Sequence, residues 1–257
     1  MREGCAALYE QPAVRWLLGG ELHPGGAEAT RRALAIVEPD PGERLLDVAC
    51  GAGQSALLAA RERDLVVTGV DASGTLVAEA RERAEADGVA DRAEFVRADA
   101  ESLPFDDGSF DLALCECSLC LFPDKEGAAA ELHRILRPGG RLALADVVAK
   151  GERLPEELRG ALATVACVGE ALSAQRLAQL LEHTGFAIGV MEHRHEDAAA
   201  MVARVEDRLR GVRILGGEAF DAAGVGGIDQ AIELAGLARQ EIDRWNLGYA
   251  IFGAWKR

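Results

Sequence analysis

The chain has 257 residues, of which 49% are hydrophobic and 5% are aromatic, and its formal net charge at pH 7 is −15. This length and hydrophobic fraction suit a single domain over residues 1–257 with a modest cap. The excess of acidic residues repels phosphate backbones and aromatic side chains are few, so we expect no nucleic-acid partner. No segment looks like a membrane span or a signal peptide, so we expect a cytoplasmic protein without a membrane partner.

The N-terminal part is expected to form a helical cap over residues 1–40. Residues 9–18 are amphipathic and predict a helix. His23 begins a His-Pro-Gly-Gly loop that directly precedes a second predicted helix over residues 27–37. One interpretation of this loop is an ordinary connection and helix cap.

The densest signature of the chain lies between residues 45 and 71. Residues 45–48 predict a buried strand that enters a turn of small residues, and a helix is expected over 52–61. A second buried strand over 66–71 ends on Asp71, about twenty residues past the turn, as in a nucleotide-binding βαβ unit. The alternative is a tight turn followed by an unrelated acid. The turn lacks a third glycine, which disfavours pyrophosphate as the ligand.

The remaining apolar runs complete an alternating pattern. Runs at 45–48, 65–70, 93–96, 110–114 and 141–148 alternate with helical stretches, and further strands are expected at 186–192 and 249–255. Helices over 197–210 and 228–244 predict a helical insertion at 195–245, before the last strand. The pattern predicts an α/β fold: a doubly wound, mostly parallel seven-stranded sheet, Rossmann-like, with a helical cap and a cofactor-binding core over 41–150.

Acidic residues follow several of these strands. Asp47, Asp71 and Asp99 fall at or near strand ends, as does the segment 115–120. Because the carboxyl ends of parallel strands share one edge of a sheet, a common ligand site is expected there.

The core residues resemble the class I S-adenosylmethionine-dependent methyltransferases, chiefly between residues 41 and 148. Residues 47–53 are similar to that family's glycine-rich first motif, with Ala49 in place of its first glycine, and Asp71 is similar to its ribose-binding acid. Residues 94–105, 110–114 and 136–142 resemble its adenine-binding loop, its fourth strand and its turn into the fifth strand. The resemblance implies S-adenosyl-L-methionine as cofactor and a last strand that inserts antiparallel.

The same resemblance implies a set of cofactor contacts. The Asp99 side chain would meet the adenine amino group and the Ala100 amide a ring nitrogen, and the loop after His23 is similar to one that closes over the methionine end of the cofactor. For Cys115, which ends the fourth strand, packing in the core is the favoured alternative. The implied cofactor-binding residues are Asp47, Ala49, Gly51, Gly53, Asp71, Ala72, Asp99, Ala100 and Cys115.

The six cysteines bear on the methyl acceptor. A disulfide framework is not expected in a cytoplasmic chain of this size. Cys117 and Cys120 form a C-x-x-C pair, but a structural zinc site needs a second pair, so no resident metal is expected. The alternative is that the cysteines act only as small buried hydrophobes.

Residues 154–172 more loosely resemble a segment of the arsenite methyltransferases whose cysteine binds trivalent arsenic, and residues 122–125 and 145–147 are also similar. The resemblance implies a thiol-bound metalloid as acceptor, and Cys167 is expected to approach at least one other thiol of the set. That family's N-terminal cysteine pair is here reduced to one residue, and its C-terminal extension is missing or replaced by residues 196–246. The implied catalytic residues are Cys167, Cys117, Cys120 and Cys5.

The chemistry of the methyl acceptor distinguishes a metalloid substrate from a small organic substrate. Trivalent arsenic has a lone pair and needs no general base, whereas an oxygen or carbon nucleophile usually needs one. No His-Asp pair is evident in the sequence, which favours the metalloid or thiol reading. The alternatives are a small-molecule O-, N-, C- or S-methyltransferase whose cysteines only line the pocket and, less favoured, a non-catalytic cofactor-binding protein. The roles of His23, His193 and His195 and the oligomeric state stay open.

Overall fold

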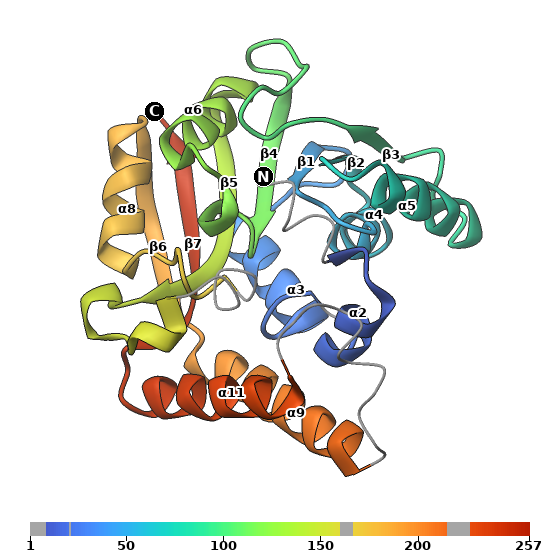
Figure 1. Ribbon diagram of the computed structural model, residues 1–257. Helices are drawn as coiled ribbons and strands as arrows, with labels where there is room; N and C mark the ends of the chain where they lie inside the picture. The colour runs from blue at the N-terminus through green and yellow to red at the C-terminus, as the bar shows by residue number, and fades with distance from the viewer. Residues whose placement is uncertain (1–8, 21, 160–166, 215–226) are drawn as a thin grey trace.

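The computed structural model describes residues 9–20, 22–159, 167–214 and 227–257. A seven-stranded sheet has the order β3-β2-β1-β4-β5-β7-β6. The strands β1 to β5 pair in parallel, and β7 is antiparallel to both of its neighbours, β5 and β6. This confirms the predicted doubly wound α/β fold (Figure 1). The strands are β1 (Arg44–Val48), β2 (Val66–Asp71), β3 (Ala93–Arg97), β4 (Phe110–Glu116), β5 (Leu136–Ala149), β6 (Phe186–His193) and β7 (Leu247–Lys256).

Helices cover both faces of the sheet, because its strands are apolar on both sides. One core cluster joins α3, α4 and α5 to the sheet, and a second joins α6 and α8 to the opposite face. The helices are α2 (Pro12–Leu18), α3 (Gly26–Val37), α4 (Gln54–Arg63), α5 (Gly74–Ala86), α6 (Lys125–Ile135), α8 (Ala174–His183), α9 (His195–Ile214) and α11 (Ile228–Asp243), with short 3-10 turns η1 (Leu119–Leu121), η2 (Gly151–Arg153) and η3 (Glu156–Arg159).

The strand β5 starts earlier than the sequence predicts. Residues 136–140 were expected to be a turn, but Leu136 pairs with Phe110 before the register shifts and Leu112 pairs with Arg141. The Lys256 ammonium donates to the Leu136 carbonyl at 2.7 Å, so the early pairing is held from β7 as well. The difference arises from contacts with distant strands, which local turn residues do not encode.

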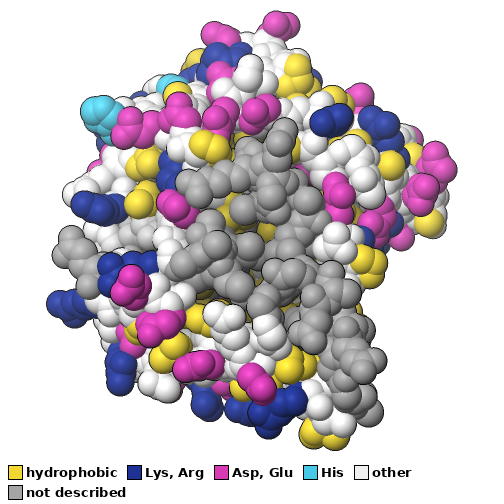
Figure 2. Space-filling view, viewed as in Figure 1, with side chains coloured by type: hydrophobic (Ala, Val, Ile, Leu, Met, Phe, Trp, Pro, Cys, Tyr) yellow, Lys and Arg dark blue, Asp and Glu magenta, His cyan; other side chains and the backbone are white. Residues whose placement is uncertain are grey.

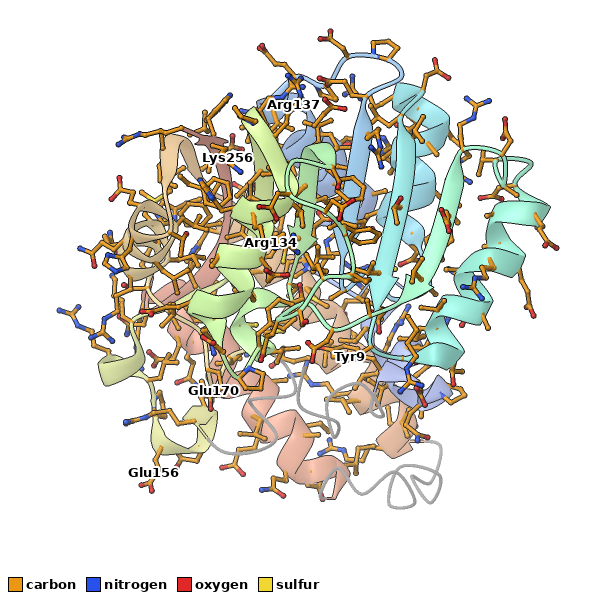
Figure 3. All side chains as sticks on the ribbon, turned by 90° about the horizontal axis from the view of Figure 1, so that it is seen from above. Tyr9, Arg134, Arg137, Glu156, Glu170 and Lys256 are labelled. Atoms are coloured by element: carbon orange, nitrogen blue, oxygen red, sulfur yellow. The ribbon has the colours of Figure 1, made fainter. Side chains whose placement is uncertain are left out.

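Arg134 on α6 fixes the loop that follows β3. Its guanidinium donates to the carbonyl oxygens of Leu103 at 3.0 Å and Phe105 at 2.7 Å, and it pairs with Glu131 on its own helix (Figure 3). These bonds hold the loop after Asp99 against the face of the sheet that α6 covers.

The helices α9 and α11 pack against each other and against β7, and α9 also contacts α2. They run across the lower edge of the molecule as drawn in Figure 1, in the region where the sequence predicts a helical insertion. On the face shown in Figure 2, acidic and basic side chains are interspersed. Within the described residues, no helix combines the length and the apolar character needed to cross a membrane.

Gly69 in β2 leaves space for the ring of Phe95 and for the turn after β1. A Cβ at position 69 would come within 2.5 Å of Phe95 Cδ1 and 2.9 Å of Cys50 Sγ. We expect Gly69→Ala to lower the free energy of unfolding by about 1–3 kcal/mol through overpacking, measured by urea denaturation. Gly74→Ala is the control, because its Cβ would meet only Arg97, at 3.7 Å. An unchanged midpoint for Gly69→Ala would show that Phe95 moves aside without cost.

Candidate active site

The turn between β1 and α4 is built from residues with positive φ. Ala49 has φ 58°, Gly51 has φ 54°, and Gly53, which caps α4, has φ 78°. Glycine reaches this region freely, whereas alanine does so at a steric cost. Ala49 therefore adopts the backbone conformation that a glycine would normally occupy, and the expected motif is preserved in shape. The amide of Cys50 donates to the Val70 carbonyl at 2.9 Å, which ties the turn to β2.

Asp71 at the end of β2 organises this turn. Its carboxylate accepts the Gly51 amide at 2.9 Å and the Ser73 amide at 2.8 Å, and the residue is 3% exposed. Burial raises the pKa of Asp71 even though both amide bonds act in the opposite direction. The acid thus connects the turn after β1 with the start of α5, and its remaining lone pairs are available to a ligand.

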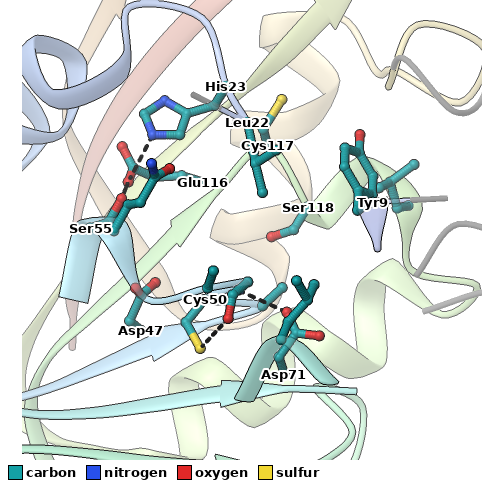
Figure 4. A pocket seen from close by; sticks show the side chains of 16 residues that line it. Tyr9, Leu22, His23, Asp47, Cys50, Ser55, Asp71, Glu116, Cys117 and Ser118 are labelled. Carbon is teal, nitrogen blue, oxygen red and sulfur yellow. Dashed lines mark hydrogen bonds and ion pairs between the residues drawn. The ribbon is translucent and has the colours of Figure 1, made fainter. Parts of the chain in front are cut away.

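A pocket lies along these strand ends (Figure 4). The turn after β1 and Asp71 form one side of the pocket. Ser55, Glu116 and His23 lie together on another side, and Tyr9 and Cys117 lie across from the turn in this view. Its lining consists of Tyr9, Leu22, His23, Asp47, Ala49, Cys50, Gly51, Ala52, Gln54, Ser55, Asp71, Leu76, Glu116, Cys117, Ser118 and Leu121.

The lining carries three acids and, among the described residues, no Lys or Arg. Asp47 is 2% exposed, and its Oδ2 has no hydrogen-bond partner in the described part of the chain. Burial raises the pKa of Asp47 well above its usual range, and the nearby charges of Glu116 and Asp71 raise it further. A cationic ligand would give the unpartnered Asp47 oxygen an interaction partner and would reduce the repulsion among the three carboxylates. The residues present therefore fit a positively charged cofactor.

The third acid of the pocket, Glu116 at the end of β4, lies close to polar groups from three elements. It accepts the Ser55 hydroxyl at 2.6 Å and the Thr30 hydroxyl at 3.1 Å, and its Oε2 lies 3.7 Å from His23 Nε2. His23 and Glu116 are 10% and 5% exposed at their side chains. Sequence reasoning missed this pair because its members are far apart in the chain. The buried Thr30 on the otherwise apolar face of α3 was the available signal.

The cysteines after β4 meet Cys167, as the sequence predicted. The Sγ atoms of Cys117 and Cys167 are 3.7 Å apart, and Cys167 Sγ lies 3.3 Å from the Cys117 carbonyl oxygen. Tyr9 Oη lies 3.8 Å from the same sulfur. Both of these cysteines have positive φ, 51° and 63°, a conformation that is uncommon outside glycine. Cys5 lies outside the described residues.

The three thiols differ in acidity. Hydrogen bonds from Cys117 and Cys120 lower the pKa of Cys167 well below the usual thiol value and outweigh the opposing effect of burial. The pKa of Cys117 is raised by its hydrogen bond to Cys167, and burial raises that of Cys120. The hydrogen bonds of this cluster therefore favour the ionised form of Cys167 over that of its two neighbours.

We therefore expect the Cys167 thiolate to form at a pH below the usual thiol pKa of about 8.5. Because the folded pKa of Cys167 is depressed, its charge is present above that lowered value and is lost as the pH falls through it. The ultraviolet absorbance of the thiolate during a pH titration measures this. Cys167→Ser should remove the low-pH step, and Cys117→Ala should move it to higher pH by removing the main donor. A titration that is the same in both variants and the wild type would contradict the assignment.

Several predicted cofactor contacts do not line the described pocket, namely Gly53, Ala72, Asp99, Ala100 and Cys115. Asp99 is exposed, and its Oδ1 accepts the Glu101 amide at 3.1 Å. Cys115 is fully buried with its Sγ 3.1 Å from Ser118 Oγ, so the packing alternative fits this residue and a cofactor contact does not. The roles of the others stay predictions.

The remaining histidines of interest lie away from the pocket. His193 is exposed at the end of β6. His195 Nε2 lies 2.5 Å from the Ile242 carbonyl oxygen, and its ring stacks on Trp245 at 3.9 Å between centroids. Its contacts join α9 to the end of α11, which is a structural role.

Comparisons with known proteins agree with this geometry. A model of the methyltransferase domain matches residues 46–144. The chain is 36% identical over 188 residues to O-methyltransferase cnsE from Penicillium expansum, covering 67% of each chain. It is 38% identical over 153 residues to 27-O-demethylrifamycin SV methyltransferase from Amycolatopsis mediterranei (strain S699), covering 56% of each. The chain spans only about half the length of the first curated relatives it matches, 47% and 56%.

Among solved structures, phosphoethanolamine N-methyltransferase 2 from Haemonchus contortus superposes on this chain with a TM-score of 0.76. That structure is a complex with phosphomonomethylethanolamine and S-adenosylhomocysteine. It is 25% identical to this chain, and the match covers 98% of this chain and 56% of that one. The motif after β1, the strand order and these relatives agree with one another. The chain belongs to the class I S-adenosylmethionine-dependent methyltransferases, and its cofactor is S-adenosyl-L-methionine.

Proposed function

We propose that the protein methylates a hydroxyl oxygen of a small organic acceptor. The observation that carries this proposal is the buried pair of His23 and Glu116 on the wall of the cofactor pocket. An oxygen nucleophile needs a base as its proton leaves, and histidine is the side chain most often used. Relatives named as O-methyltransferases support the same acceptor atom.

The cofactor supplies an electrophilic methyl group on a sulfonium, and the chain's own residues bind and orient it. Asp71 would accept hydrogen bonds from the ribose diol while it holds the Gly51 amide in place. Asp47 and Glu116 would face the cationic end of the cofactor, where their charges are compensated. Because the pocket follows the edge of the sheet from Asp71 to Glu116, the acceptor is expected at the Glu116 end, in line with the methyl group.

His23 would take the hydroxyl proton. Its Nδ1 lies 3.3 Å from the Pro24 carbonyl oxygen, which favours the tautomer with the proton on Nδ1 and a lone pair on Nε2. The lone pair at Nε2 would accept the proton of the acceptor, and the Glu116 carboxylate 3.7 Å away would stabilise the resulting imidazolium.

The test is an acceptor screen with cofactor labelled at the methyl group, including hydroxylated aromatic and aliphatic compounds, amines, small thiols, arsenite and selenite. Label recovered in a methyl ether supports the proposal. Label recovered only in amine or sulfur products rejects it, and label recovered only in methylated arsenic or selenium rejects it and favours the second candidate.

The second candidate function is methyl transfer to a thiol-bound metalloid such as trivalent arsenic, and the contact of Cys117 with Cys167 favours it. Soft thiolates suit such a centre, and no general base is required. Arsenite should then protect these cysteines from alkylation. Cys167→Ser should abolish arsenite methylation and leave cofactor affinity unchanged, whereas equal alkylation with and without arsenite would exclude this candidate.

A further inference from the structure

The thiols beside the pocket lie close to a buried carboxylate that the proposed function does not use. One sulfur of Cys117, one sulfur of Cys167 and a carboxylate oxygen of Asp146 all lie within 4.8 Å of one another. Cys117 is on the segment after β4, Asp146 is in β5, and Cys167 follows η3 in the chain. Three elements that are distant in sequence therefore bring two soft ligands and one oxygen ligand to one point.

The spacing of the sulfurs agrees with tetrahedral coordination. A Zn–S bond is about 2.3 Å long, so two thiolates on a tetrahedral zinc ion lie roughly 3.8 Å apart. The observed distance between the Cys117 and Cys167 sulfurs is 3.7 Å. The two sulfurs are therefore already separated as two thiolates on one tetrahedral zinc ion would be.

The charge at this point is uncompensated in the protein alone. Asp146 is 2% exposed, and among the described residues no Lys, Arg or His pairs with it. Two adjacent buried groups of the same sign are costly to ionise together, and a divalent cation between them would remove that cost.

The surroundings hold the carboxylate in place. Asp146 accepts the Cys120 amide at 2.9 Å through Oδ2 and the Val147 amide at 2.8 Å through Oδ1, and it also receives a hydrogen bond from the Cys120 side chain. These bonds fix the orientation of the carboxylate. The hydroxyl of Tyr249 is also fully buried and has no hydrogen-bond partner among the described residues.

We propose that Cys117, Cys167 and Asp146 bind one soft divalent cation of the zinc type at the acceptor end of the cofactor pocket. Cys117 lines that pocket, whereas Cys167 and Asp146 are not among its lining residues. Three protein ligands would leave one position of a tetrahedral ion for a water molecule or an acceptor group, as in catalytic rather than structural zinc sites. This inference goes beyond the proposed function, and its test does not depend on methyl transfer.

Cobalt(II) titration of the full-length chain, kept reduced by a phosphine, tests the site, because thiolate-to-cobalt absorption reports ligation directly. We expect about one equivalent to bind and to be displaced by Zn²⁺. Cys117→Ser, Cys167→Ser and Asp146→Asn should each weaken binding at least about tenfold, a loss of roughly 1.4 kcal/mol. Cys115→Ser is the matched control, because this buried thiol contacts Ser118 instead.

A second measurement uses the wild-type protein, so its result does not depend on whether the variants fold. Zn²⁺ should shield Cys117 and Cys167, but not Cys50, from alkylation as mapped by mass spectrometry. Absence of thiolate-to-cobalt absorption together with unshielded cysteines would overturn the proposal. Arsenite binding without binding of either divalent ion would also overturn it, and would leave the metalloid candidate standing.

Discussion

Asp71→Ala is expected to weaken binding of S-adenosylmethionine by roughly 10- to 150-fold. A hydrogen bond to a charged group contributes about 1.5–3 kcal/mol, and the variant loses the acceptor for the ribose diol. The carboxylate also holds the amides of Gly51 and Ser73, so its removal loosens the turn that approaches the cofactor. Isothermal titration calorimetry with S-adenosylhomocysteine measures the change without turnover.

Two further variants separate the roles of Asp71. Asp71→Asn keeps one acceptor oxygen and nearly the same shape, so its loss of affinity should be smaller. Asp91→Ala removes an acid that is 73% exposed at its side chain and should leave affinity unchanged. If Asp71→Ala binds as tightly as the wild type, with the same circular dichroism spectrum, Asp71 is not the ribose acceptor.

His23→Asn is expected to lower kcat for an oxygen acceptor by about 10²- to 10⁴-fold, the usual contribution of a general base. Cofactor affinity should change little, because the variant removes a proton acceptor and keeps a polar side chain of smaller size. Steady-state kinetics with the acceptor identified in the labelled screen measure kcat, and calorimetry measures the cofactor Kd.

The exposed His193 supplies the matched control, and His193→Asn should retain full kcat. The same His23 variant distinguishes the two candidate functions, because methylation of arsenite needs no base and should proceed at close to the wild-type rate. A normal kcat for a hydroxyl acceptor in His23→Asn would remove His23 from the mechanism.

The sheet and its ligand edge could be predicted because their signals are local. An apolar strand, a turn of small residues and Asp71 on the next strand all fall within a short stretch, and period and composition determine such elements. The start of β5 could not be predicted in this way, since Leu136 is extended only because it pairs with Phe110.

The candidate site was predicted in part. Cys167 was linked to Cys117 through a family resemblance, and the structure shows their contact. The pairing of His23 with Glu116 and the place of Asp146 beside the thiols depend on how α3, β4 and β5 pack. The residues around His23 and around Asp146 in the sequence do not indicate which distant side chains lie beside them. Only the tertiary structure reveals these two contacts.

The conformation of Ala49 has a consequence for how the cofactor enters. An alanine held at φ 58° has few alternatives within the folded protein, and the Asp71 carboxylate and the Val70 carbonyl fix the residues beside it. The turn is therefore held in one conformation in the free protein, and little of its conformational entropy remains to be lost when the cofactor associates. Binding should follow a single kinetic phase whose rate rises linearly with cofactor concentration, with no slower rearrangement of this turn.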